Sequence, residues 1–206
     1  MKNSFYIHFS KPFLDLLFSG IALLILSPLF ILSMLCIKLE DGGRIFFIQE
    51  RVGRHFKPFK LIKFRTMTEI QPENAILITK GGDNRITNTG RILRMLKIDE
   101  LPQLINVLFR QMSIVGPRPE VDKYVSMFKK DYILILESYP GISDYASIKY
   151  RDEESILAKY SDTEDAYINI ILPDKIKLYK KYVSNISFKT DMEVILKTVW
   201  SLFNVK

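Results

Sequence analysis

The first hydrophobic feature of the chain is an unbroken apolar run near its N-terminus. Residues 16–37 hold no charged side chain, and as one straight helix they would extend about 33 Å, enough to cross the core of a bilayer. Ser27-Pro28 lies in the middle of this run. Proline removes a helical N–H and collides with the preceding turn, so the pattern predicts a kink. We therefore expect residues 1–40 to form a re-entrant membrane helix that bends at Ser27-Pro28 and leaves by the face it entered.

Two other interpretations of the apolar run were weighed against this one. A cleaved signal peptide fits poorly, because the run is long and no small-x-small cleavage site precedes Lys38. A straight transmembrane span stays open as an alternative. Basic residues flank the run on both sides, which gives no inside–outside asymmetry. A hairpin with both flanks in the cytoplasm accounts for this distribution.

Downstream, residues 41–206 combine short apolar patterns with turn residues and predict one mostly helical α+β domain. Residues 44–49 and 59–64 have the pattern of short strands, separated by a turn at residues 51–54, and together predict a β-hairpin. Residues 68–83 are expected to form a loop or a broken helix.

The remaining patterns are helical. Residues 91–97 predict a basic helix, and Asp99 is placed to N-cap a following helix that runs to about Arg110. Apolar residues from Val121 to Tyr132 recur at helical spacing. A last apolar stripe favours either a core helix or an interfacial amphipathic helix. Its members are Met192, Ile195, Leu196, Val199, Trp200 and Phe203.

Positive charge is concentrated in one part of the chain. Residues 44–97 hold twelve Lys/Arg and four Asp/Glu, a local +8, whereas the whole chain carries +7. Such a patch suits anionic lipid head groups, nucleotide phosphates or nucleic acid, and a solvated surface is the plain alternative. The single cysteine, Cys36, allows no internal disulfide.

The inventory of reactive side chains favours phosphate chemistry. The two histidines, His8 and His55, are far apart in sequence, which argues against a zinc site or a histidine-based triad. No P-loop or GxGxxG fingerprint occurs. Carboxylates, arginines and lysines remain, and these suit Mg²⁺ and phosphoryl transfer, which depends mainly on positioning and charge neutralisation.

The pair Asp99-Glu100 is the most informative group of carboxylates. Alone it is ordinary chemistry for the start of a helix. Arg94 lies five residues upstream, and Arg118 is held between two prolines. Arginine can grip a phosphate through two parallel hydrogen bonds. Lys63 and Arg65 alternate around Phe64 on a predicted strand and should point to one face.

Several long motifs resemble the bacterial sugar transferases, the monotopic phosphoglycosyl transferases. Besides Ser27-Pro28, they are FIQERVG at residues 47–53, FKLIKFRTM at 59–67, DNRIT at 83–87, IDELPQLINVL at 98–108, MSIVGPRP at 112–119 and PGI at 140–142. The resemblance covers nearly the whole chain. It departs from the family at Pro12, where an arginine is usual, and over residues 140–147.

The resemblance implies a reaction. A sugar 1-phosphate would pass from a UDP-sugar to undecaprenyl phosphate with release of UMP, at the cytoplasmic face of the bacterial inner membrane. Asp99 would be the nucleophile that forms a phosphosugar–aspartate intermediate, and Glu100 would orient it. Both carboxylates would meet Mg²⁺.

The resemblance also assigns the other polar residues. Arg118 would hold phosphate, with help from Arg94, Lys63 and Arg65. Asp144 and Arg151 lie in the region expected to meet the nucleotide or sugar. Phospholipid is the further expected partner, a homodimer is allowed, and nucleic acid is not expected.

Two rival functions were considered. A membrane-anchored protein that binds anionic lipid or RNA through the basic patch would leave Asp99-Glu100 without a role. A two-metal hydrolase of lipid diphosphates would need more clustered carboxylates than the middle of this chain offers.

Overall fold

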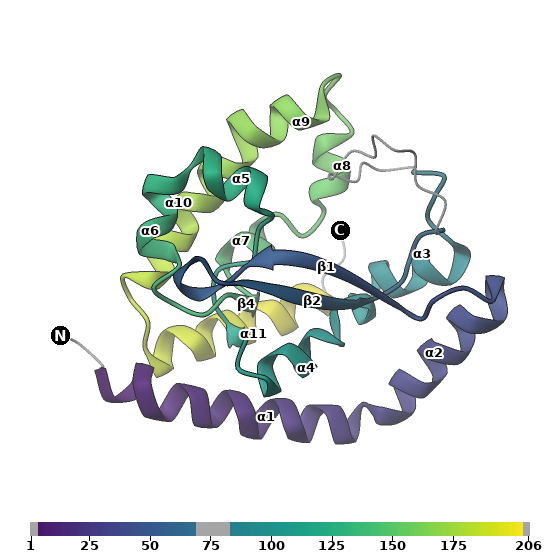
Figure 1. The fold of residues 1–206 in the computed structure, drawn as a ribbon, viewed down its shortest axis with the longest axis horizontal. Coiled ribbons are helices and arrows are strands. Elements are labelled where there is room, and N and C mark those ends of the chain that lie inside the picture. The colour runs from purple at the N-terminus through teal and green to yellow at the C-terminus, as the bar shows by residue number, and fades with distance from the viewer. Residues whose placement is uncertain (1–3, 69–82, 204–206) are drawn as a thin grey trace.

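The chain folds as a mostly helical α+β structure with two small sheets (Figure 1). The computed structural model describes residues 4–68 and 83–203, so most of the predicted loop over residues 68–83 lies outside the described residues. The helices and helical turns are η1 Tyr6–Ser10, α1 Lys11–Ile25, α2 Ser27–Asp41, η2 Arg54–Phe56, α3 Asn88–Met95, η3 Ile98–Glu100, α4 Gln103–Leu108, α5 Asp122–Met127, α6 Lys129–Ile135, α7 Tyr145–Lys149, α8 Glu153–Leu157, α9 Thr163–Ala166, η4 Tyr167–Ile171, α10 Leu172–Val183 and α11 Phe188–Phe203. The strands are β1 Phe46–Val52, β2 Pro58–Phe64, β3 Ser113–Val115 and β4 Gly141–Ser143.

The apolar N-terminal run forms two helices that meet at Leu26. Leu26 leaves helical geometry, with φ −86° and ψ 1°. Pro28 has no N–H to give to the carbonyl of Leu24, and the Ser27 hydroxyl donates to that carbonyl instead, at 2.8 Å. In Figure 1, α2 turns away from the direction of α1 and rises towards α3. Within the described ranges, Tyr6–Ile25 is the one helical stretch long and apolar enough to cross a membrane, judged by length and composition only.

The predicted hairpin is confirmed, although its first strand was placed too early. β1 and β2 pair antiparallel from Phe46 opposite Phe64 to Val52 opposite Pro58, so the strand continues through residues assigned to the turn. Val52 stays in the strand because its side chain is buried in the main core and its N–H donates to Glu120. The chain reverses in η2 instead, where His55 and Phe56 adopt positive φ.

The second sheet is a short parallel pair packed unusually closely. β3 pairs with β4, Ser113 opposite Gly141 and Val115 opposite Ser143. A Cβ on Gly141 would lie 2.0 Å from the N atom of Gly116, so this crossing requires glycine. β3 also contacts α1, which runs along the lower side of the molecule in Figure 1. The short sheet therefore ties the N-terminal helix to the residues that follow β3.

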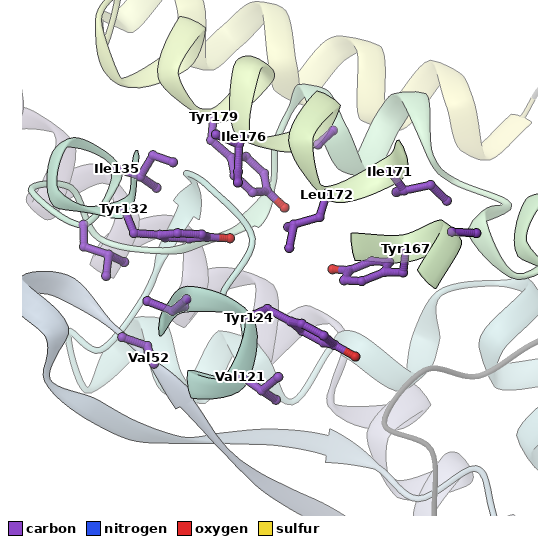
Figure 2. Packing of buried hydrophobic residues seen from close by; sticks show 14 of the residues in the cluster. Val52, Val121, Tyr124, Tyr132, Ile135, Tyr167, Ile171, Leu172, Ile176 and Tyr179 are labelled. Atoms are coloured by element: carbon purple, nitrogen blue, oxygen red, sulfur yellow. The ribbon is translucent and has the colours of Figure 1, made fainter. Parts of the chain in front are cut away.

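The main hydrophobic core lies between β1 and the helices α5, α6 and α10 (Figure 2). It is rich in buried tyrosine, with Tyr124, Tyr132 and Tyr179 in one cluster. The single helix expected across residues 121–132 is wrong, because the helical geometry breaks at Phe128 (φ −114°, ψ 32°). Two short helices, α5 and α6, then present their tyrosines to the same core.

The apolar stripe of the last helix, α11, is divided between exposed and half-buried positions. Leu196 and Trp200 are 64% and 65% exposed, and Val199 is also exposed. The face of α11 that packs inward carries Asp191 and Val194, and Ile195 of the stripe is partly buried against the same core cluster. This arrangement favours an interfacial helix, since its large apolar side chains face outwards.

Candidate active site

Asp99 and Glu100 lie in the helical turn η3, between α3 and α4. The expectation that Asp99 caps the next helix is wrong, because α4 begins at Gln103 and Pro102 holds the cap position. Lys97 adopts left-handed geometry (φ 58°) and separates η3 from α3. The Asp99 carboxylate is therefore not used to satisfy a helix N-terminus, which removes the simplest structural explanation for the pair.

The Asp99 side chain is buried and has an uncommitted oxygen. The residue is 9% exposed, and its Oδ1 has no hydrogen-bond partner among the described residues. Burial, with the nearby charge of Glu100, raises the pKa of Asp99, while Lys63, Lys97 and Arg94 oppose that rise. A buried polar atom without a partner is costly, so its retention here points to a role in binding or chemistry.

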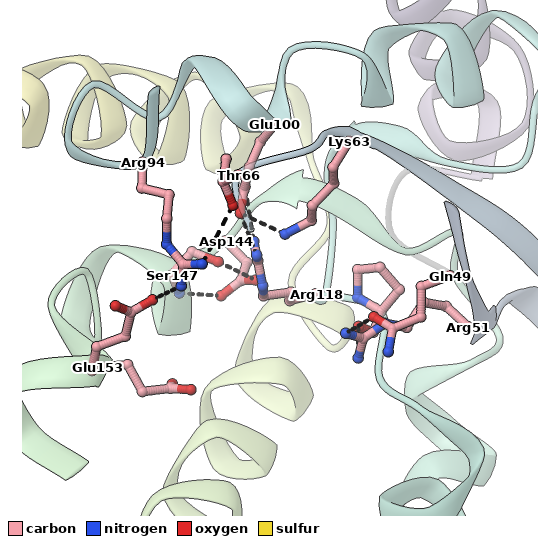
Figure 3. A network of polar contacts seen from close by, with 12 residues as sticks. Gln49, Arg51, Lys63, Thr66, Arg94, Glu100, Arg118, Asp144, Ser147 and Glu153 are labelled. Atoms are coloured by element: carbon pink, nitrogen blue, oxygen red, sulfur yellow. Dashed lines mark hydrogen bonds and ion pairs between the residues drawn. The ribbon is translucent and has the colours of Figure 1, made fainter. Parts of the chain in front are cut away.

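Glu100 has the opposite environment, since two cations hold its carboxylate (Figure 3). Lys63 Nζ donates to Oε1 at 3.0 Å, and Arg118 donates to both oxygens, with Nη1 3.0 Å from Oε2. Burial disfavours the charged form, but Arg118 and Lys63 outweigh it and hold the pKa of Glu100 well below its usual range. Glu100 is the structural centre of the cluster, and Asp99 is its free carboxylate.

Lys63 and Arg118 reach Glu100 from separate elements. Lys63 lies on β2, and burial lowers its pKa while Glu100 opposes that shift. Arg118 follows β3 and is fixed between Pro117 and Pro119. Only two of the five guanidinium N–H groups are used on Glu100. The remaining N–H groups of Arg118 can still bind a phosphate.

Arg94 completes the positive side of the site from α3. Its Nη1 lies 3.4 Å from the hydroxyl of Thr66, and Nη2 forms an ion pair with Glu154. A cavity of about 520 Å³ adjoins this pair, and the described residues that line it are Asp83, Asn84, Ile86, Arg91 and Glu154. Arg94 therefore lies between the carboxylates and an open cavity.

The start of α3 explains how Arg94 is held. α3 begins at Asn88, earlier than predicted, because Thr87 caps it by accepting a hydrogen bond from the N–H of Gly90 at 2.9 Å. A Cβ on Gly90 would lie 2.2 Å from the carbonyl oxygen of Thr66. This close approach packs α3 directly on the chain segment that carries Lys63 and Thr66.

Two predicted phosphate or nucleotide ligands lie apart from the cluster. Arg65 is just past the end of β2, and its guanidinium pairs with both oxygens of Asp41 at the end of α2. Arg65 thus contacts Asp41, whereas Lys63 contacts Glu100. Arg151 lies between α7 and α8, and no contact among the described residues joins it to Asp99 or Glu100.

Asp144 is beside the site but faces inwards. It is 1% exposed and caps α7, with Oδ1 accepting from the Ser147 N–H at 2.8 Å and Oδ2 from the Ser147 hydroxyl at 3.1 Å. Burial raises its pKa, and the Ser147 N–H and the charge of Arg118 oppose that rise. The placement supports a role in holding the backbone near Arg118 more than direct contact with a nucleotide.

The described residues can offer a metal ion very few ligands. They contain no group of three or more Asp, Glu, His or Cys side chains with metal-binding geometry. Glu100 is already paired, which leaves Asp99, whose Oδ1 makes no hydrogen bond with a described residue. Mg²⁺ often binds through one or two carboxylates together with substrate phosphates and water. The site fits that mode and not a cage built by the protein alone.

Sequence reasoning missed two residues that the structure connects to the site. Thr66 lies against Arg94, and only its place in the motif at residues 59–67 marked it. Asp15 accepts hydrogen bonds from Ser113 and Ile114 of β3. Asp15 could have been found from the sequence, because a carboxylate at the edge of an apolar run is unusual unless it has a partner elsewhere in the fold.

Comparisons with known proteins give one consistent result. The family model described as "Bacterial sugar transferase" matches residues 6–205. The chain is 34% identical over 194 residues to the UDP-N-acetylgalactosamine-undecaprenyl-phosphate N-acetylgalactosaminephosphotransferase of Aeromonas hydrophila, covering 93% of the chain and 43% of the relative. It is 33% identical over 206 residues to the exopolysaccharide production protein ExoY of Rhizobium meliloti (strain 1021), covering 92% and 84%.

A third relative has the same character. The chain is 32% identical over 193 residues to the UDP-glucose:undecaprenyl-phosphate glucose-1-phosphate transferase of Klebsiella pneumoniae, covering 92% of the chain and 39% of the relative. The chain thus spans less than half the length of the Aeromonas and Klebsiella proteins and most of the length of the Rhizobium protein.

Proposed function

The chain belongs to the bacterial sugar transferase family, and from that premise we propose that it is a sugar-phosphate transferase that moves a sugar 1-phosphate from a UDP-sugar to undecaprenyl phosphate. In the first step, Asp99 attacks the phosphorus that bears the sugar, a P–O bond forms, and the bond to UMP breaks. In the second step, the phosphate of the lipid attacks the aspartyl phosphosugar. The product is undecaprenyl diphosphate sugar, and Asp99 is regenerated.

This proposal rests on the different hydrogen bonding of the two carboxylates. Asp99 has a buried oxygen without a hydrogen bond, whereas Glu100 is held by Lys63 and Arg118. A nucleophile must present an uncommitted lone pair to phosphorus, and only Asp99 does so. Glu100 then acts by fixing the two cations at a distance suited to a phosphate beside Asp99.

The basic side chains around Asp99 are suited to binding the diphosphate of the donor, and do not serve the nucleophile alone. A diphosphate brings several negative charges, and phosphoryl transfer is accelerated chiefly by neutralising and aligning them. Arg118 keeps unused N–H groups, and Lys63 and Arg94 lie within electrostatic reach of Asp99. Mg²⁺, held by Asp99 and by the oxygens of the bound diphosphate, would supply additional charge neutralisation.

Membrane attachment follows from exposed apolar side chains on both sides of the site in sequence. Met95 and Leu96 precede Asp99, and Phe109 follows α4, all more than half exposed. Helices α1 and α2 expose further large apolar residues, among them Phe13, Leu24, Ile25, Leu32 and Leu39. We infer that the helix pair enters the inner leaflet from the cytoplasm, bends at Leu26 and returns. This topology would bring Asp99 to the depth of the lipid phosphate.

The direct test uses the purified protein in detergent with Mg²⁺, undecaprenyl phosphate and a panel of UDP-sugars. Release of UMP with at least one donor is expected, and it should stop when Mg²⁺ is chelated. Incubation with that donor and no lipid should add the mass of one phosphosugar to wild type and nothing to Asp99→Asn. Turnover without any adduct, undiminished in Asp99→Asn, would exclude the covalent mechanism.

Topology needs a separate measurement. The native Cys36 is replaced by serine, and single cysteines are placed at residue 4 or residue 40. Both should react with an impermeant maleimide from the same side of sealed vesicles if the helix is re-entrant. Reaction from opposite sides would establish a straight span instead.

A further inference from the structure

The strand before Arg118 is completed by side chains of the membrane helix. β3 pairs with β4 on one side. On another side, Asp15 Oδ1 accepts from the Ile114 N–H at 3.1 Å and Oδ2 accepts from the Ser113 hydroxyl at 2.7 Å. Lys11 Nζ donates to the Val115 carbonyl at 2.9 Å. Asp15 gives the Ile114 N–H an acceptor on the side of the strand that faces an apolar helix, and Lys11 is one of the donors to the Val115 carbonyl.

The same side chains join the C-terminal helices. Asp191 of α11 is buried and accepts from Lys11, from the Tyr6 hydroxyl at 2.7 Å and from the Tyr182 hydroxyl at 2.7 Å. Tyr182 also donates to the Val115 carbonyl at 2.9 Å. One network therefore fixes α1, α10 and α11 around the end of β3.

The link from β3 to Arg118 is short and stiff. Val115 is followed by Gly116-Pro117-Arg118-Pro119. Gly116 has no room to shift, since even a Cβ there would lie 2.5 Å from the Tyr139 carbonyl. Both prolines restrict φ beside Arg118. A displacement of β3 would consequently move the Arg118 guanidinium relative to Glu100.

We propose that Asp15 and Lys11 are positioning residues, through which the membrane helix sets the place of Arg118 and hence the grip on the donor phosphate. The proposal rests on the proposed function. It assigns the charged side chains of the N-terminal helix a role in donor binding that is separate from membrane attachment. Because phosphate is bound before and during transfer, loss of this support should raise the KM for the donor more than it lowers kcat.

The test is a double-mutant cycle between Asp15 and Arg118. Asp15→Ala should raise the donor KM about tenfold while kcat stays within about twofold, and the Kd for UDP measured by calorimetry should weaken in parallel. Asp15→Asn keeps one acceptor oxygen and should recover most of the loss. In an Arg118→Ala background, Asp15→Ala should add less than about a twofold change, because the residue acts through Arg118.

Two further variants separate positioning from folding and attachment. Ser113→Ala removes the hydroxyl that donates to Asp15 and also to the Val115 carbonyl. It should give a smaller KM increase of the same kind, even if Asp15→Ala fails to fold. Ser33→Ala is the matched control, because Ser33 is buried in α2 and bonds only within its own helix, to the Leu29 carbonyl at 2.8 Å. It should leave KM unchanged. Vesicle flotation should be equal for all variants.

The proposal is overturned if the Asp15→Ala effect is undiminished in the Arg118→Ala background, or if it falls on kcat alone. It is also overturned if the KM loss accompanies lost vesicle binding. Failure of the proposed function has a different signature, since wild type would then release no UMP from any donor. The UDP binding cycle would still decide the positioning role in that case.

Discussion

Replacing each carboxylate of the pair by its amide should have opposite effects on stability. Glu100→Gln removes the charge that Lys63 and Arg118 share and leaves one carbonyl oxygen for both. Asp99→Asn removes a charge from a side chain whose Oδ1 makes no hydrogen bond with a described residue. We therefore expect the first variant to be much less stable and the second to keep the stability of wild type.

The magnitudes follow from burial and contacts. Removing one partner of a buried ion pair costs roughly 3–5 kcal/mol, and because the side chains of Lys63 and Arg118 are 20% and 27% exposed, we expect the low end, about 3 kcal/mol. At about 2–4 °C per kcal/mol for a chain of this size, the Tm should fall by about 6–12 °C. Asp99→Asn should change stability by less than about 0.5 kcal/mol or increase it slightly.

The direction of the stability change in Asp99→Asn follows from the pKa of Asp99. Burial and Glu100 raise the folded-state pKa of Asp99 above the unfolded value. Its contribution to stability is then full below the unfolded pKa and is lost as pH rises through the folded pKa. At neutral pH the buried, ionised side chain of Asp99 destabilises the folded state, and the neutral amide removes this destabilisation. Transfer activity should nevertheless fall by at least about 10⁴-fold, as expected when a nucleophile is lost.

The assay combines thermal unfolding, followed by the fluorescence of the single tryptophan, with UMP release. Both amide variants are purified in the same detergent as wild type and measured at pH 7. An Asp99→Asn protein that loses as much Tm as Glu100→Gln would refute the assignment of Glu100 as the structural carboxylate. Equal turnover by Asp99→Asn and wild type would refute the role of Asp99.

Three further predictions concern the scaffold and the membrane surface. The hydrogen bonds from Arg65 lower the pKa of Asp41 to about 2, so this pair adds stability above about pH 4. That stability is lost as pH falls towards 2, and the Tm difference between wild type and Asp41→Asn should shrink across that range. Gly141→Ala should destabilise by about 3 kcal/mol or more, because its Cβ would lie 2.0 Å from a backbone N atom. Gly20→Ala places its Cβ with nothing within 4 Å and should unfold at the wild-type temperature or slightly above it, because alanine favours the helix α1. The double variant Phe109→Ser, Leu196→Ser should bind vesicles more weakly in flotation. Its Tm should stay unchanged, since both side chains are more than 60% exposed. Unaltered flotation would show that these side chains do not contact the membrane.

Local sequence patterns were sufficient for the features that depend on neighbouring residues. Alternation around Phe64 marked a strand of the hairpin. Proline in an apolar run marked the interruption next to Leu26. The motif with Asp99 and Glu100 marked the carboxylate pair that Lys63 and Arg118 contact in the structure. In each case the determinant lies within a few residues of the feature it controls.

Tertiary contacts decided the features that the sequence did not reveal. Arg65 was expected beside Lys63, yet it pairs with Asp41, which is 24 residues away. The N-cap role expected for Asp99 failed because Lys97 takes left-handed geometry and starts a separate turn. Contact between Asp15 and Ile114 spans 99 residues. No pattern in a short window contains such information.

The way β3 is completed by α1 has a consequence for biogenesis. On the ribosome, α1 emerges before residues 113–115 are made, so under the proposed topology it would meet the lipid first. Under the proposed topology, Arg118 would be seated only when that later segment folds back on a helix already in the membrane. Assembly would then be tied to the bilayer surface. A variant without α1 would lose the side chains that hold β3, Asp15 and Lys11, together with the proposed membrane attachment.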